Sequence, residues 1–154
     1  MWKARLVLEA FHAADALASF ERRLGSGAGA VVTFTGLARG QDRGGSAVQR
    51  LFLQHHPRLT QQSLDEIAEA ATRRFDVQAV EVVHRAGGIA PGEAIVWVGA
   101  ASAHRRAAFE AADYLMDRLK TEAMFWKRED GPGGSTWIEP TDQDHQERAQ
   151  WSRE

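Results

Sequence analysis

The chain of 154 residues contains no cysteine, and that absence excludes several kinds of chemistry. Disulfide bonds, a thiolate nucleophile and cysteine metal ligands are all impossible. If the protein handles sulfur, the sulfur must arrive on a partner or on a substrate. No hydrophobic run reaches the length of a membrane-spanning helix, and the N-terminal residues lack the apolar core of a signal peptide. We therefore expect a cytoplasmic protein with no membrane contact.

Lysine is scarce, with three lysines against sixteen arginines. Two of the three, Lys120 and Lys127, lie seven positions apart beside aromatic residues. Arginine stays cationic, whereas a lysine amine can lose its proton when partly desolvated. The pair therefore predicts proton transfer or attack on an acyl group. The alternatives are a helix-terminal charge for Lys120 and an outward-facing strand residue for Lys127. The two together are the stronger signal, because a helix end and the next strand can face one cleft.

The remaining composition narrows the range of partners. The net charge of −2 and the scattered arginines give no reason to expect nucleic acid binding, so any anion must bind at a local patch. His55 and His56 are adjacent in a predicted strand and point to opposite faces. No carboxylate lies at a useful spacing from the histidines, so we expect no metal site and no cofactor.

Strands and helices mix without regular alternation, which predicts an α+β fold. We expect a single domain over residues 1–140 and a loose polar tail over 141–154 in which Trp151 alone could dock. Residues 36–46, with four glycines, predict a mobile loop. The buried stripe of the last predicted helix is Phe109, Ala112, Leu115, Met116 and Leu119. The predicted strands are 3–9, 30–35, 48–55, 77–84, 94–100 and a hairpin of 125–128 with 136–139; the predicted helices are 13–24, 57–75 and 102–120.

Two segments are candidates for binding an anion. Ser102 is a predicted helix cap, and His104, Arg105 and Arg106 follow it at the positive end of the helix dipole, where free N–H groups and cations suit a phosphate. Arg39 lies in the glycine-rich loop after a strong strand. In both segments the alternative is that the arginines only meet solvent.

Four motifs in order carry a resemblance to a known family. They are residues 29–36 with Arg39, His84-Arg85 leading to Gly92, 102–105, and 119–129. On these motifs the chain resembles the catalytic (large) subunit of molybdopterin synthase over residues 28 to 139. The resemblance implies an α/β-hammerhead fold with a mixed, mainly antiparallel sheet and two to three helices.

The resemblance also implies an activity and partners. The family subunit is a homodimer within a heterotetramer, where it binds a small ubiquitin-like sulfur carrier whose Gly-Gly tail ends in a thiocarboxylate. It converts cyclic pyranopterin monophosphate into the dithiolene molybdopterin, a sulfurtransferase reaction in molybdenum cofactor biosynthesis that needs no metal at this step. The alternative is a non-catalytic dimeric module that binds a phosphate ligand or the carrier tail.

The motifs carry family roles onto this sequence. Lys120 is the implied catalytic lysine, closest to the thiocarboxylate, and Lys127 assists it. Family members commonly have a basic residue where Leu37 stands and a proline where Met124 stands. The first departure predicts weaker substrate binding, and the second predicts a looser turn before Lys127. The implied substrate-binding residues are Leu37, Ala38, Arg39, His104, Arg105, Arg128 and Glu129.

Overall fold

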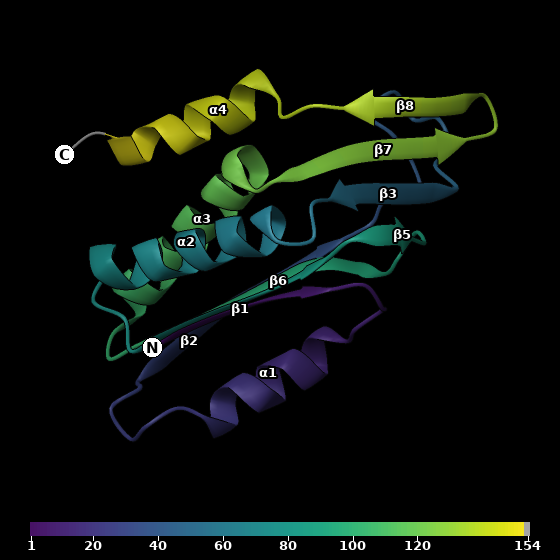
Figure 1. The fold of residues 1–154 in the computed structure, drawn as a ribbon. Helices are drawn as coiled ribbons and strands as arrows, with labels where there is room; N and C mark the ends of the chain where they lie inside the picture. Colours follow the sequence, from purple (N-terminus) through teal and green to yellow (C-terminus); the bar gives the residue numbers. More distant parts are fainter. Residues whose placement is uncertain (153–154) are drawn as a thin grey trace.

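The computed structural model describes residues 1–152, which form two four-stranded sheets and the helices around them (Figure 1). The α+β class is confirmed, and the helix that the sequence did not predict is the last one, α4. In chain order the elements are β1 (Trp2–Val7), α1 (Ala13–Arg22), β2 (Ala30–Leu37), β3 (Arg50–His55), α2 (Leu59–Arg74), β4 (Ala79–Arg85), β5 (Gly87–Ile89), β6 (Ala94–Ser102), α3 (Arg105–Glu122), β7 (Phe125–Gly131), β8 (Gly134–Ile138), α4 (Asp142–Ala149) and a 3₁₀ turn, η1 (Gln150–Ser152).

The first sheet has the order β1-β4-β6-β2, with β1 parallel to β4 and the other pairs antiparallel. Helix α1 covers one face and helices α2 and α3 cover the other (Figure 1). Successive side chains of a strand point to opposite faces. In β6, Trp97 accordingly packs edge-on against Phe20 of α1, while Val98 packs on the opposite side with α2 and α3. With both faces covered, β6 needs apolar residues throughout, as its sequence predicted.

Helix α3 buries most of its predicted stripe. Ala112, Leu115 and Leu119 are buried against the first sheet, and Met116 is partly buried. Phe109 was predicted in this stripe but is 56% exposed, so that prediction is wrong. The predicted cap is also wrong, since the N-cap residue is His104. Ser102 ends β6 instead, and its hydroxyl donates to the Asp76 carbonyl at 2.8 Å.

The second sheet has the order β5-β3-β7-β8 and is antiparallel throughout. Leu51, Leu53 and Ile89 of this sheet form a small core with Ala38 at the junction of the two sheets. Strand β5 begins the segment that leads from His84-Arg85 to Gly92, where no strand was predicted. At Gly88 a Cβ atom would meet the guanidinium of Arg50, so a side chain there would require Arg50 to move.

Residues 36–46 were predicted to form a mobile loop, but they form a hydrogen-bonded turn. The Asp42 N–H donates to the Ser46 carbonyl at 2.8 Å, and the Ser46 N–H donates to the Asp42 carboxylate at 2.8 Å. Gly45 has φ of +84°, which favours glycine at that position. The Val48 N–H donates to the Gly40 carbonyl at 2.9 Å, so hydrogen bonds hold the loop in one conformation.

Residues 141–152 are also more ordered than the predicted loose tail. Thr141 caps α4 through a reciprocal pair of hydrogen bonds with Asp144, which satisfies free N–H groups at the helix start. The sequence carried this signal as Thr141-x-x-Asp144. Among residues 1–152, no helix is long and apolar enough to cross a membrane.

Candidate functional site

Lys120 lies in the last turn of α3, and its side chain is 56% exposed. Its amine nitrogen is 3.8 Å from a carboxylate oxygen of Asp144, which belongs to α4. The helix-end position therefore leaves the amine accessible, with a carboxylate held beside it.

Lys127 lies on β7, one short turn after α3, and other cations surround it. Desolvation by the surrounding protein lowers the pKa of Lys127, and the charges of Lys120, Arg43 and Arg39 lower it further. Glu129, on the same face of the strand, acts in the opposite direction. The structure thus brings the two amines into one electrostatic cluster with two loop arginines.

The turn between α3 and β7 is pinned to α2. Thr60 donates to the Met124 carbonyl at 2.6 Å, and the Met124 N–H donates to the Ser63 hydroxyl at 3.1 Å. A proline at position 124 would lack that N–H group. Methionine thus makes a hydrogen bond that a proline could not make, and the expectation of a looser turn stays a prediction.

The loop after β2 supplies the cluster's arginines. Arg39 and Arg43 line an open pocket of about 730 Å³ with neighbouring loop residues, and Leu37 is 55% exposed at the start of the loop. Ala38 is buried, and its N–H and C=O both bond to residues of the turn before β6. This placement gives no support to direct substrate contact by Ala38.

Arg128 faces away from the amines, because adjacent residues of a strand point to opposite sides. Its guanidinium makes two hydrogen bonds to Asp130, at 2.7 and 3.0 Å. It also stacks over Phe52 and Trp137, with its central carbon 4.8 and 5.6 Å from the ring centroids. Within one chain, the side chains of Arg128 and Lys127 therefore lie on opposite faces of the second sheet.

His104 and Arg105 lie at the opposite end of α3 from Lys120. Fifteen residues of helix separate Arg105 from Lys120, a rise of about 22 Å. His104, Arg105 and Arg106 line an open pocket of about 530 Å³ at the start of the helix. One chain therefore does not bring the predicted phosphate ligands to the amines.

The His84-Arg85 motif is part of the core. His84 is buried and stacks on Phe125, with ring centroids 4.2 Å apart, and burial lowers its pKa to about 4. Arg85 donates to the Gly88 carbonyl at 2.8 Å and lies 3.6 Å from Glu93. This motif supports the strand from which Lys127 projects, since Phe125 begins β7.

Sequence reasoning missed several residues of the site. Arg43 was assigned to a loop without a role, and Asp144 to a tail. Their signals were weak: a second arginine in the glycine-rich loop and a capping box after a hairpin. Thr60 and Ser63 gave no signal, because only the folded structure brings α2 to the turn at Met124.

The fold and the site define a small α+β protein that gathers amines and arginines at the end of one helix. A model of the MoaE protein family matches residues 7–122. The chain is 53% identical over 126 residues, 82% of each chain, to the molybdopterin synthase catalytic subunit of Caulobacter vibrioides. It is 48% identical over 123 residues, 80% of this chain and 81% of the other, to that of Escherichia coli K12.

Solved structures agree. The molybdopterin biosynthesis MoaE protein from Burkholderia ambifaria superposes with a TM-score of 0.83 at 34% identity, covering all of both chains. The molybdopterin synthase of Staphylococcus aureus superposes with a TM-score of 0.77 at 25% identity, covering 86% of this chain and 94% of the other. The chain therefore belongs to the MoaE protein family.

Proposed function

We propose that this chain is the catalytic subunit of a molybdopterin synthase. It transfers one sulfur from the C-terminal thiocarboxylate of each of two small carrier proteins, in turn, to cyclic pyranopterin monophosphate, and the two sulfurs form the dithiolene. The observation that carries the proposal is the cluster of Lys120 and Lys127 with Arg39 and Arg43, found in a member of the MoaE family.

The cluster suits the charges of this reaction. The carrier tail and the pterin phosphate are both anionic, and desolvated cations bind anions more strongly than solvated ones. The thiocarboxylate sulfur bonds to a pterin carbon and displaces an oxygen there, which leaves the tail and the pterin joined as a thioester. Water then adds to the acyl carbon through a tetrahedral oxyanion, the acyl C–S bond breaks, and the sulfur stays on the pterin while the tail leaves as a carboxylate. An ammonium group beside the oxyanion stabilises it, and a lysine can also move a proton. We assign this work to Lys120 and the orientation of the pterin to Lys127 and Glu129.

The proposal includes a second copy of the chain. His104 and Arg105 lie too far from Lys120 in one chain to act on the same small molecule. We propose that in a homodimer they bind the substrate phosphate at the partner's site, beside Leu37 and Arg39 of that site. Two carrier molecules then complete a heterotetramer in the cytoplasm.

The test is a reconstitution. Purified protein is mixed with thiocarboxylated carrier and cyclic pyranopterin monophosphate, and the oxidised fluorescent form of the product is measured. We expect product from the natural protein and none above background from Lys120→Ala of unchanged fold by circular dichroism. Carrier binding without product would instead identify a non-catalytic module, a reading that the apolar Leu37 favours.

A further inference from the structure

The amine of Lys120 has a carboxylate partner that comes from the C-terminal helix. Asp144 lies 3.8 Å from it, and the Asp144 side chain is 15% exposed against 56% for Lys120. The carboxylate is therefore the more buried member of the pair and the amine is the more exposed one. Asp144 also lies beyond residue 122, where the match to the family model ends.

Asp144 is itself held in place. One of its carboxylate oxygens accepts a hydrogen bond from the Thr141 N–H at 2.9 Å, and its own N–H donates to the Thr141 hydroxyl at 3.1 Å. Partial burial opposes ionisation, but these bonds and the charges of Lys120 and Arg43 outweigh it and lower the pKa of Asp144. The group is therefore an anion at neutral pH.

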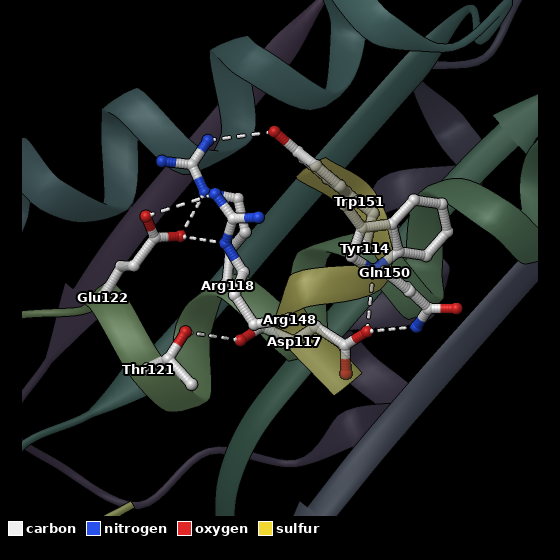
Figure 2. Close-up of polar contacts among 8 residues, drawn as sticks. All are labelled: Tyr114, Asp117, Arg118, Thr121, Glu122, Arg148, Gln150 and Trp151. Atoms are coloured by element: carbon white, nitrogen blue, oxygen red, sulfur yellow. Dashed lines mark hydrogen bonds and ion pairs between the residues drawn. The ribbon is translucent and has the colours of Figure 1, made fainter. Parts of the chain in front are cut away.

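The segment after Asp144 is fastened to α3 on both sides of Lys120. Asp117, three residues before Lys120, accepts hydrogen bonds from Trp151 at 2.7 Å and Gln150 at 3.0 Å (Figure 2). Glu122, two residues after it, accepts one from Arg148 at 2.8 Å.

Aromatic packing strengthens this attachment. The Trp151 ring meets Tyr114 and Phe75 edge-on, with centroids 5.5 and 5.6 Å apart. Helix α4 is therefore attached to α3, and its first turn places Asp144 beside the Lys120 amine.

We propose that Asp144 is a positioning residue for Lys120. A lysine at a helix end has a flexible four-carbon stem, and the charge of Lys127 repels that of Lys120. Asp144 offsets that repulsion and keeps the amine beside Lys127, where Arg39 and Glu129 also lie. The catalytic consequence rests on the proposed function, whereas the positioning of the amine does not.

The experiment compares three variants. Asp144→Asn removes the charge but keeps an oxygen that can accept from Thr141, so the cap survives. Asp144→Glu keeps the charge on a longer stem. Asp142→Asn is the control, because Asp142 is an exposed carboxylate in the first turn of the same helix. Each variant is measured for kcat and KM in the reconstituted reaction. Each is also labelled with ¹³C at lysine Cε for NMR relaxation, which three lysines make readable.

We expect Asp144→Asn to lower kcat about ten- to a hundredfold with KM unchanged, the size expected when a reacting group is misplaced. The Lys120 Cε signal becomes more mobile, while that of Lys3 does not change. Asp144→Glu recovers part of kcat, and Asp142→Asn matches the natural protein in both measurements.

Unchanged Lys120 mobility in Asp144→Asn overturns the inference, and so does an equal loss of kcat in Asp142→Asn. A change in Lys120 mobility with kcat equal to that of the natural protein also overturns it, because holding the amine in place then has no effect on turnover. If the natural protein makes no product, the proposed function fails, and the NMR comparison still decides whether Asp144 holds the amine.

Discussion

At the scale of single residues, the site is defined by how charge is distributed around two amines. Both side chains are exposed, but Lys120 faces a carboxylate, whereas Lys127 lies among other cations. The sequence could predict both lysines, because they stand out in an arginine-rich chain. It could not predict their different surroundings, since Arg43 and Asp144 come from segments that only the fold brings near.

The lowered pKa of Lys127 predicts a pH dependence. A lysine is charged below its pKa, so Lys127 loses its charge at a lower pH than an ordinary lysine. If its charge orients the pterin, kcat/KM falls as pH rises through that pKa. Glu129 raises the pKa, so Glu129→Gln should move the fall to lower pH; Arg39→Gln removes a cation and should move it to higher pH.

The measurement is the pH profile of kcat/KM, with the lysine Cε signals titrated in parallel. Lys127→Arg serves as the control, because arginine keeps its charge and should extend activity to higher pH. A fall that stays at one pH in all of these proteins would assign it to a group other than Lys127.

At the scale of elements, α2 and α4 hold the short stretch from α3 to β7 that carries both lysines. Sequence periodicity predicted α2 and α3 and the hairpin of β7 and β8, because apolar spacing and glycine turns are local signals. It missed α4 although the capping pair Thr141 and Asp144 is a local signal. The contacts of Trp151 with Phe75 and Tyr114 could not be predicted, because these residues are distant in the sequence. Sequence periodicity also placed Phe109 inside, because spacing alone does not fix where a stripe ends.

Thr60 links α2 to the turn at Met124, and its removal should have a defined cost. Thr60→Val leaves the His56 N–H and the Met124 carbonyl without their partner, at 2.8 and 2.6 Å in the natural protein. We expect the free energy of unfolding to fall by about 1–3 kcal/mol. Turnover should fall as well, because the turn aims Lys127.

The control is Thr72→Val on the same helix, where the hydroxyl bonds only to the Glu69 carbonyl one turn earlier. Urea unfolding should show a change within about 0.5 kcal/mol for this variant. An equal fall in the free energy of unfolding in the two variants would contradict the prediction. It would mean that replacing any threonine of α2 has this cost, whether or not its hydroxyl bonds to the turn.

At the scale of the whole molecule, α3 separates the predicted phosphate ligands from the amines by its own length. The sequence singled out both groups of basic residues as candidates, and helix geometry keeps them apart within one chain. A site that uses both must therefore take them from two copies. Such a site would be complete only in a dimer.

Mixed dimers test that requirement. Lys120→Ala homodimers and His104→Ala/Arg105→Ala homodimers should each be inactive. When the two are unfolded, mixed equally and refolded, half of the dimers are hybrids, and each hybrid regains one complete site. Activity should recover to about a quarter of that of the natural protein. No recovery, with hybrids present by native mass spectrometry, would contradict a shared site.

The most direct test of sulfur transfer is a single turnover followed on the carrier itself. Natural protein or Lys120→Ala is mixed with a limiting amount of thiocarboxylated carrier and excess cyclic pyranopterin monophosphate, and the carrier mass is read over time. We predict that the natural protein converts the thiocarboxylate to a carboxylate as its one sulfur passes to the pterin, and that Lys120→Ala leaves it intact while still binding the carrier. A carrier consumed at the same rate by both proteins would contradict the central role of Lys120.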